Sequence, residues 1–138
     1  MQTYLSNLAV LNAKLHNIHW NVEGKEFMQI HKFTEEIYED LFKKFDEVAE
    51  LLKMKDEMPL VKMDDYADKS TIKEESSRSF DTEESLKIVL EDLKEMKEMA
   101  TEIRNAADKD GDFQVVGEME GHVDYYSLKI WFMQSMLA

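Results

Sequence analysis

Apolar residues recur at steps of three and four along four separate stretches of this 138-residue chain. The first stretch predicts a helix over about residues 2–20, with a buried stripe of Tyr4, Leu8, Leu11, Leu15 and Ile18. The second lies at about 27–53 and the third at about 81–107, and the fourth follows residues 108–112 and runs to the C-terminus. Because each helix buries one stripe, the chain is expected to be all-α.

Between the second and third helices lies a long segment, about residues 54–80, which contains the only proline, Pro59. A short helix is predicted inside it, at about 60–67. Asp81 then begins a capping-box pattern with Glu84, which marks the start of the third helix. Two helices, a long crossover and two more helices predict a four-helix bundle of ferritin-like topology. We expect one domain over residues 1–138, a size that allows a hydrophobic core.

The charge balance excludes several classes of protein. Seventeen Lys and Arg stand against 30 Asp and Glu, a net charge of −13, which would repel a phosphate backbone and attract cations. There is no cysteine, hence no disulfide or thiolate metal site. No apolar run is long enough to span a bilayer, and no basic segment followed by an apolar stretch begins the chain. A cytoplasmic protein without membrane or nucleic-acid partners is therefore expected.

Candidate metal ligands are concentrated in the first half of the chain. His31, Glu35, Asp46 and Glu50 fall at about 0°, 40°, 60° and 100° around the second helix, so they share one face. His19, near the end of the first helix, would lie at the height of His31 once the connection near residue 24 folds the chain back. Imidazole and carboxylate ligands together suit Fe(II), and zinc or manganese would also fit.

One chain cannot close such a site, because about 22 Å of helix axis separates the first pair of ligands from the second. If two copies of the second helix pack antiparallel across a dyad near Asp40 and Leu41, the two pairs meet, twice per dimer. A site within one bundle would call for Glu-x-x-His on two helices, and that motif is absent. A metal site is not the only explanation: the acidic residues could form an ordinary solvated helix face, and the histidines could be hydrogen-bonded within the fold. We interpret His16 and His122 in this second way.

The stretch from His16 through His19 and Trp20 to Gly24, followed by His31 and then Asp46 to Glu50, resembles the ferroxidase signature of the Dps family, the mini-ferritins. The similarity extends over essentially the whole chain. The resemblance implies that iron is bound as a dinuclear site at the interface of two subunits. The implied ligands, which are also the implied catalytic residues, are His19, His31, Glu35, Asp46 and Glu50, with Trp20 beside the iron.

The resemblance also implies a function. Family members form a hollow dodecamer built from two-fold dimers, oxidise Fe(II) with hydrogen peroxide in preference to oxygen, and store ferric mineral, which protects the cell against oxidative damage. The alternative is a ferritin-like shell protein that binds metal or is structural, without catalysis. This alternative is kept open by Glu35, which stands where the family usually has Asp.

Three further expectations concern the surface of such a shell. The Lys-rich extension of the DNA-condensing members has no counterpart in this sequence, so direct DNA binding is not expected. Acidic residues near the start of the fourth helix correspond roughly to the family's pore lining, which makes Asp112, Glu118 and Glu120 candidate pore residues. Glu36, Glu39 and Asp40 are candidates for nucleating mineral on the inner surface.

Overall fold

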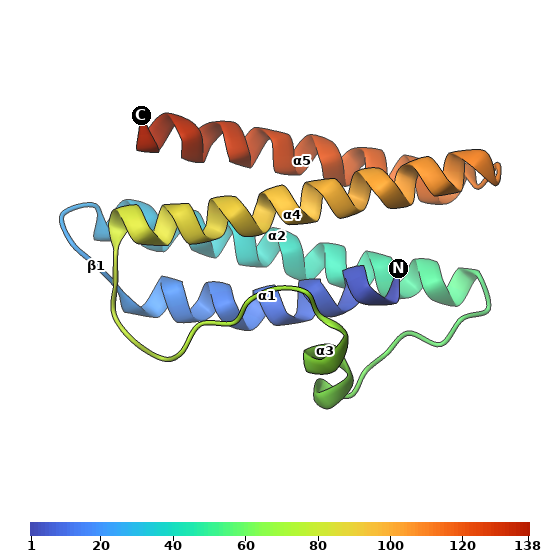
Figure 1. Ribbon diagram of the computed structural model, residues 1–138, viewed down its shortest axis with the longest axis horizontal. Helices are drawn as coiled ribbons and strands as arrows, with labels where there is room; N and C mark the ends of the chain where they lie inside the picture. Colours follow the sequence, from blue (N-terminus) through green and yellow to red (C-terminus); the bar gives the residue numbers. More distant parts are fainter. The chain divides into compact units, whose positions relative to one another are not determined.

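A computed structural model describes residues 1–138, and it contains five helices and two very short strands. The elements in chain order are α1 (Gln2–Asn21), β1 (Val22–Glu23), α2 (Phe27–Met54), α3 (Met63–Lys69), β2 (Phe80–Asp81), α4 (Thr82–Lys109) and α5 (Phe113–Leu137) (Figure 1). The four long helices are those that the sequence predicts, with their ends displaced by one or two residues. No helix is long and apolar enough to cross a membrane.

The chain forms two compact units, residues 1–85 and residues 86–138. In the first unit α1 packs along α2, with α3 against α1, and the predicted stripes are buried. Leu8, Ile18 and Ile37 are each 0% exposed. Burial of one large aliphatic side chain contributes about 1.5–3 kcal/mol, so these stripes hold α1 and α2 together.

The connection after α1 contains a structure that the sequence analysis missed. Val22 and Glu23 form strand β1, which pairs in parallel with β2 through the registers Val22↔Phe80 and Glu23↔Asp81. Gly24 follows with a φ of +132°, in the region that favours glycine. Two residues are too few for an alternating pattern to be recognised. The small ladder ties the end of the crossover to the α1–α2 connection.

The crossover is held on α1 by side-chain amides. Asn7, which is fully buried, accepts hydrogen bonds at Oδ1 from Ser70 Oγ and Thr71 N, both at 2.8 Å. Near the start of α1, Gln2 Oε1 accepts from Leu60 N at 3.1 Å. These bonds satisfy backbone groups that a loop would otherwise leave to water.

The short helix on the crossover is confirmed, but it begins three residues later than predicted. Leu60 is tied to Gln2, and Lys62 keeps an extended backbone as the N-cap of α3. Asp64 and Asp65 then occupy the first turn, where the helix dipole favours negative charge.

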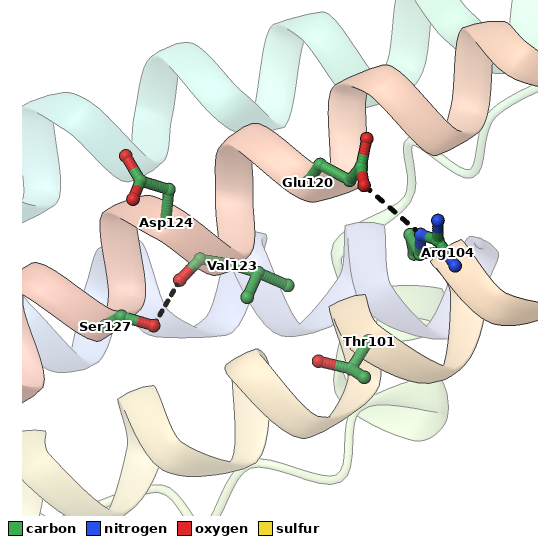
Figure 2. A pocket seen from close by; sticks show the side chains of 6 residues that line it. All are labelled: Thr101, Arg104, Glu120, Val123, Asp124 and Ser127. Atoms are coloured by element: carbon green, nitrogen blue, oxygen red, sulfur yellow. Dashed lines mark hydrogen bonds and ion pairs between the residues drawn. The ribbon is translucent and has the colours of Figure 1, made fainter.

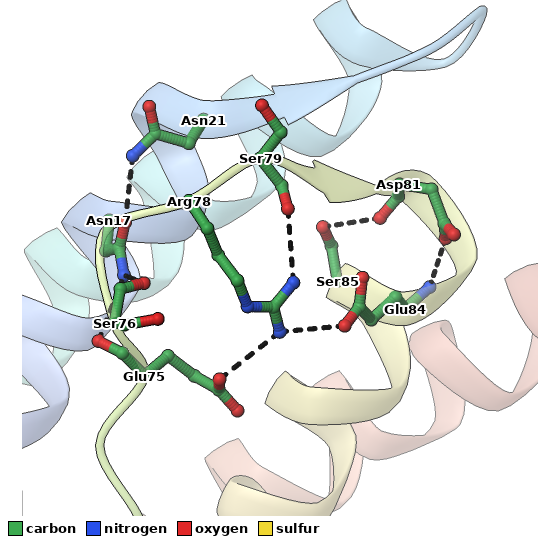
Figure 3. Close-up of polar contacts among 9 residues, drawn as sticks. All are labelled: Asn17, Asn21, Glu75, Ser76, Arg78, Ser79, Asp81, Glu84 and Ser85. Carbon is green, nitrogen blue, oxygen red and sulfur yellow. Dashed lines mark hydrogen bonds and ion pairs between the residues drawn. The ribbon is translucent and has the colours of Figure 1, made fainter.

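The start of α4 corrects one detail of the predicted capping box. Asp81 Oδ1 accepts from Glu84 N at 2.7 Å, as expected, but the Glu84 carboxylate binds the Arg78 guanidinium at 2.8 Å (Figure 3). Arg78 also contacts Glu75 at 3.2 Å and lies 4.1 Å from the centre of the Phe80 ring. The hydrogen bond to Glu84 is the main reason why the pKa of Arg78 is raised.

In the second unit α4 and α5 form a helical hairpin. Gly111 has a φ of +70° at the turn, and Asp112 caps α5 by accepting from Val115 N at 3.2 Å. Arg104 on α4 lies 3.4 Å from Glu120 on α5, beside a hollow of about 360 Å³ that Thr101 and Ser127 also line (Figure 2).

Candidate metal centre

His19 and His31 form a reciprocal pair where α1 and α2 meet. His19 Nδ1 lies 2.6 Å from the carbonyl oxygen of His31, and His31 Nδ1 lies 2.8 Å from the carbonyl oxygen of His19. The two rings are stacked, with centroids 3.7 Å apart and planes 12° from parallel. The predicted meeting of position 19 with position 31 is confirmed.

This pairing fixes the tautomer of both imidazoles. A carbonyl oxygen can only accept, so each Nδ1 carries a proton and donates it. In the neutral ring the lone pair is then on Nε2, the atom able to bind a metal. Histidine ligands in metal sites are commonly oriented through their second nitrogen in this way. Burial is the main reason why the pKa of His19 is lowered, which favours the neutral, ligating form.

Thr34 adds a second anchor that the sequence analysis did not single out. Its side chain is 1% exposed, and Oγ1 lies 3.3 Å from His19 Nδ1. The hydroxyl is held by Ile30, since Oγ1 donates to that carbonyl at 2.7 Å. In the sequence, the only indication of this role is that Thr34 lies one helical turn after Ile30, on the buried side of α2.

Aromatic rings surround the histidines. Phe27 stacks on His31 with centroids 4.9 Å apart, and Tyr38 meets His19 edge-on at 5.2 Å. His16 stacks on Tyr38 at 3.8 Å, and its Nδ1 lies 2.6 Å from the Asn12 carbonyl. His16 is thus a packed, hydrogen-bonded residue, in agreement with its structural interpretation.

Glu35 belongs to this end of α2, one turn after His31. The pKa of His19 is lowered, chiefly by burial, and the negative charge of Glu35 acts in the opposite direction. The pKa of Tyr38 is raised, first by burial and then by the charge of Glu35. The carboxylate therefore lies in the electrostatic range of both rings. Coordination of a metal by Glu35 stays a prediction.

Asp46 and Glu50 lie far along the same helix. Both are exposed, and α2 runs unbroken from Phe27 to Met54, so about 22 Å of axis separates them from His31 and Glu35. A single chain does not gather three of the five predicted ligands into one coordination sphere. The geometric premise of the two-chain hypothesis, a continuous helix with the ligands at opposite ends, is confirmed.

The outer face of α2 also carries apolar side chains. At about 100° per residue, Met28 and Phe42 fall at about 60° and 20° from His31, within the span of the predicted ligands. They are 54% and 56% exposed, and Trp20 at the end of α1 is 67% exposed. The buried stripe of α2, including Ile37 and Leu41, lies at about 240–280°, on the other side. Large exposed apolar side chains among acids are typical of a surface that another protein covers.

The predicted pore residues each have a local partner in the second unit. Asp112 caps α5, Glu120 pairs with Arg104, and Glu118 lies 3.0 Å from His122. These contacts do not test a role at a pore between subunits. The pore assignment and the nucleating role of Glu36, Glu39 and Asp40 stay predictions.

Comparison with known proteins identifies the family. The Ferritin family, described as a ferritin-like domain, matches residues 1–138. The "DNA protection during starvation protein" of Helicobacter pylori is 36% identical over 129 residues, which cover 94% of this chain and 90% of that protein. The chain belongs to the Dps family of ferritin-like proteins.

Solved structures of Dps proteins and their relatives have the same fold. The crystal structure of Helicobacter cinaedi CAIP has a TM-score of 0.97 and 36% identity, over 99% of this chain and 96% of that one. A Dps protein from Vibrio cholerae, described as a member of a superfamily of ferritin-like diiron-carboxylate proteins, has a TM-score of 0.95 and 27% identity, over 99% and 86%. The predicted fold, a ferritin-like helical bundle with a short helix on the crossover, is confirmed.

Proposed function

We propose that two copies of this Dps-family chain pair across a dyad near the middle of α2 and oxidise Fe(II) at two equivalent sites. Each site would combine His19, His31 and Glu35 of one copy with Asp46 and Glu50 of the other. The observation that carries the proposal is the outer face of α2, where the oriented histidine end and the exposed carboxylates lie at equal distances along the helix from the point between Asp40 and Leu41. An isologous pairing about this point brings the two ends together twice.

The proposed ligand set suits two iron ions as substrate. Each imidazole is anchored through Nδ1 and presents Nε2, and the carboxylates supply the negative charge that stabilises the ferric product. Two Fe(II) ions give two electrons to one hydrogen peroxide molecule, which takes up two protons and becomes two water molecules. Both electrons go to one oxidant, so no hydroxyl radical is released. Hydrogen peroxide would accordingly be the preferred oxidant.

We further propose that the dimers assemble into a dodecameric shell that stores the ferric product as mineral. The support is family membership and the fold shared over 99% of the chain with Dps structures. The strongly negative chain, at −13, would draw Fe(II) toward such a shell. Direct DNA binding is not part of the proposal, because the same charge opposes it. Analytical ultracentrifugation should show a single species of twelve chains.

The decisive experiment mixes anaerobic, Fe(II)-loaded protein rapidly with hydrogen peroxide and follows ferric absorbance. Wild-type protein should oxidise Fe(II) much faster than buffer, and faster with peroxide than with oxygen. Asp46→Ala should lose this acceleration while keeping its helical content and assembly. Asp68→Ala removes the same charge from an exposed position on α3 and should behave as wild type. Equal rates for Asp46→Ala and wild type would contradict the proposal.

The second candidate function is a metal-binding shell protein without catalysis. The observation that favours it is Glu35, whose side chain is one methylene longer than the Asp usual in the family. A longer arm changes the position of a bridging carboxylate and could leave a site that holds zinc or manganese but does not turn over. Tight Zn(II) binding together with Fe(II) oxidation no faster than buffer would select this alternative.

A further inference from the structure

A second pair of metal-ligating side chains lies on α5, in the unit formed by residues 86–138. Glu118 and His122 are four residues apart, so they stand one above the other on the helix. His122 Nε2 lies 3.0 Å from Glu118 Oε1. His122 is 3% exposed, although imidazole is a polar group that could lie in water at no cost. Neither residue belongs to the proposed iron-oxidising site.

The imidazole of His122 is buried, whereas the side chain of Glu118 is 31% exposed. Burying an imidazole costs free energy unless it is hydrogen-bonded, and the Glu118 carboxylate supplies that bond. The imidazole is further held by Tyr126, which is 0% exposed and meets the ring edge-on with centroids 6.4 Å apart. The ring thus has a fixed position rather than a choice of rotamers.

The distance between the two ligand atoms matches the bite of a metal ion. Two ligands bound at about 2.1 Å and at right angles to each other lie about 3.0 Å apart, since that is the diagonal of the square they define. Glu118 Oε1 and His122 Nε2 are 3.0 Å apart. A cation bound by both atoms would replace the proton that now joins them, with a rotation of the side chains that directs each lone pair toward the cation.

We propose that Glu118 and His122 bind one divalent first-row cation, such as Zn(II) or Co(II), at a site separate from the iron-oxidising site. One carboxylate oxygen and one imidazole nitrogen from adjacent turns form the chelate, and water fills remaining positions. Mixed nitrogen and oxygen ligands favour these ions over Ca(II) and Mg(II). The bound cation would stabilise α5, because it binds the folded helix and not the unfolded chain.

The test uses the full chain with the other site disabled. In an Asp46→Ala, Glu50→Ala background, which alters only exposed side chains, isothermal titration with Zn(II) alone should show one high-affinity cation per chain. Adding Glu118→Gln or His122→Gln should weaken this binding at least tenfold. The matched control is Glu120→Gln, which removes the same charge from an exposed position on α5 and should leave binding unchanged.

A second readout separates binding from folding. Co(II) bound by an imidazole and a carboxylate shows visible absorption bands, which Glu118→Gln should remove while the helical circular dichroism of the metal-free protein stays at its parent value. Zn(II) should raise the Tm of the parent and of Glu120→Gln, but not that of Glu118→Gln. Unchanged Zn(II) affinity in both Glu118→Gln and His122→Gln would overturn the proposal. This result does not depend on whether the wild-type protein oxidises Fe(II).

Discussion

The two ends of α2 differ in how much of the proposed site one chain can build. At the histidine end, comprising His19, His31 and Glu35, both imidazoles are oriented by hydrogen bonds to the backbone and ring stacking. At the acidic end, Asp46 and Glu50 are exposed. The rigid half of the site is therefore prepared before any partner arrives, whereas the carboxylates gain a fixed position only when something binds them.

This difference has a physical reason. Imidazole has a second nitrogen that the chain can use as an anchor, so orientation and ligation occupy different atoms. A carboxylate on a helix surface has several rotamers and is solvated by water. Fixing it in one position therefore costs conformational entropy and hydration. In the proposed dimer, contacts with the partner subunit and with Fe(II) would fix the carboxylates at the acidic end.

The largest effect is expected from Phe42→Glu. Phe42 is the exposed apolar side chain nearest to the proposed dyad on the outer face, so the change would place two negative charges against each other. Such opposition costs several kcal/mol, and the dimer dissociation constant should rise by roughly 1,000-fold, with loss of Fe(II) oxidation. Sedimentation measures the first and stopped-flow absorbance the second. Val61→Glu, at a position 78% exposed on the crossover, serves as the control.

Next in size is complementation between the two ends. His31→Ala and Asp46→Ala should each abolish rapid oxidation alone, because each spoils both sites of its own dimer. In a mixed dimer one site loses both ligands and the other keeps both. If the chains are unfolded together and reassembled at random, about a quarter of the wild-type sites should return. No recovery from a properly assembled mixture would mean that the two ends do not share a site.

Thr34→Val tests the anchoring of the histidine end. The change removes the hydroxyl near His19 Nδ1 while keeping the buried volume nearly constant. Loss of a buried hydrogen-bonding group should lower the free energy of unfolding by about 1 kcal/mol, measured by urea denaturation. Zn(II) affinity at the iron-oxidising site should fall by roughly tenfold, since a supporting contact is lost. The same change at exposed Thr101, on α4, should affect neither quantity.

The smallest effect concerns pH. The pKa of His19 is lowered in the folded protein, chiefly by burial, so the unfolded chain binds a proton there more readily. The metal-free protein should therefore be most stable above the ordinary value of 6.5 and should lose stability as pH falls through 6.5 toward the folded pKa, by at most about 1.4 kcal/mol per pH unit. His19→Gln should flatten this slope, as followed by urea unfolding at a series of pH values.

The sequence predicts the periodic parts of this molecule well. A stripe such as Tyr4 to Ile18 contains several apolar residues at helical spacing, and each of them independently supports the same helix. The four long helices could therefore be predicted from their stripes. The β1–β2 ladder could not be predicted, because two residues carry no period and their partners are 58 positions apart. The link between Glu84 and Arg78 was missed for a different reason: the two residues are only six positions apart, but they meet because of the path of the chain between them, which no periodic pattern encodes.

For the candidate site, too, some features could be predicted from the sequence and others could not. The shared face of His31, Glu35, Asp46 and Glu50 depends only on helical phase, and α2 is helical throughout, so the sequence was sufficient. The contributions of Thr34 and Tyr38 depend on how α1 lies against α2, and no local pattern encodes it. From the sequence, His122 was interpreted as a satisfied histidine without a ligand role. The burial of its ring and its distance from Glu118 became visible only in three dimensions.

The unbroken course of α2 from Phe27 to Met54 limits how this chain can change over evolutionary time. Inserting one residue between Glu35 and Asp46 would turn the acidic end by about 100° and shift it by about 1.5 Å relative to the histidine end. A deletion would do the reverse. In the proposed dimer, the spacing along α2 sets the alignment of both sites, so we expect its length between the ligands to tolerate substitutions but not single-residue insertions or deletions. Tolerated length changes should instead collect in the crossover, where residues can be added without altering the phase of either end.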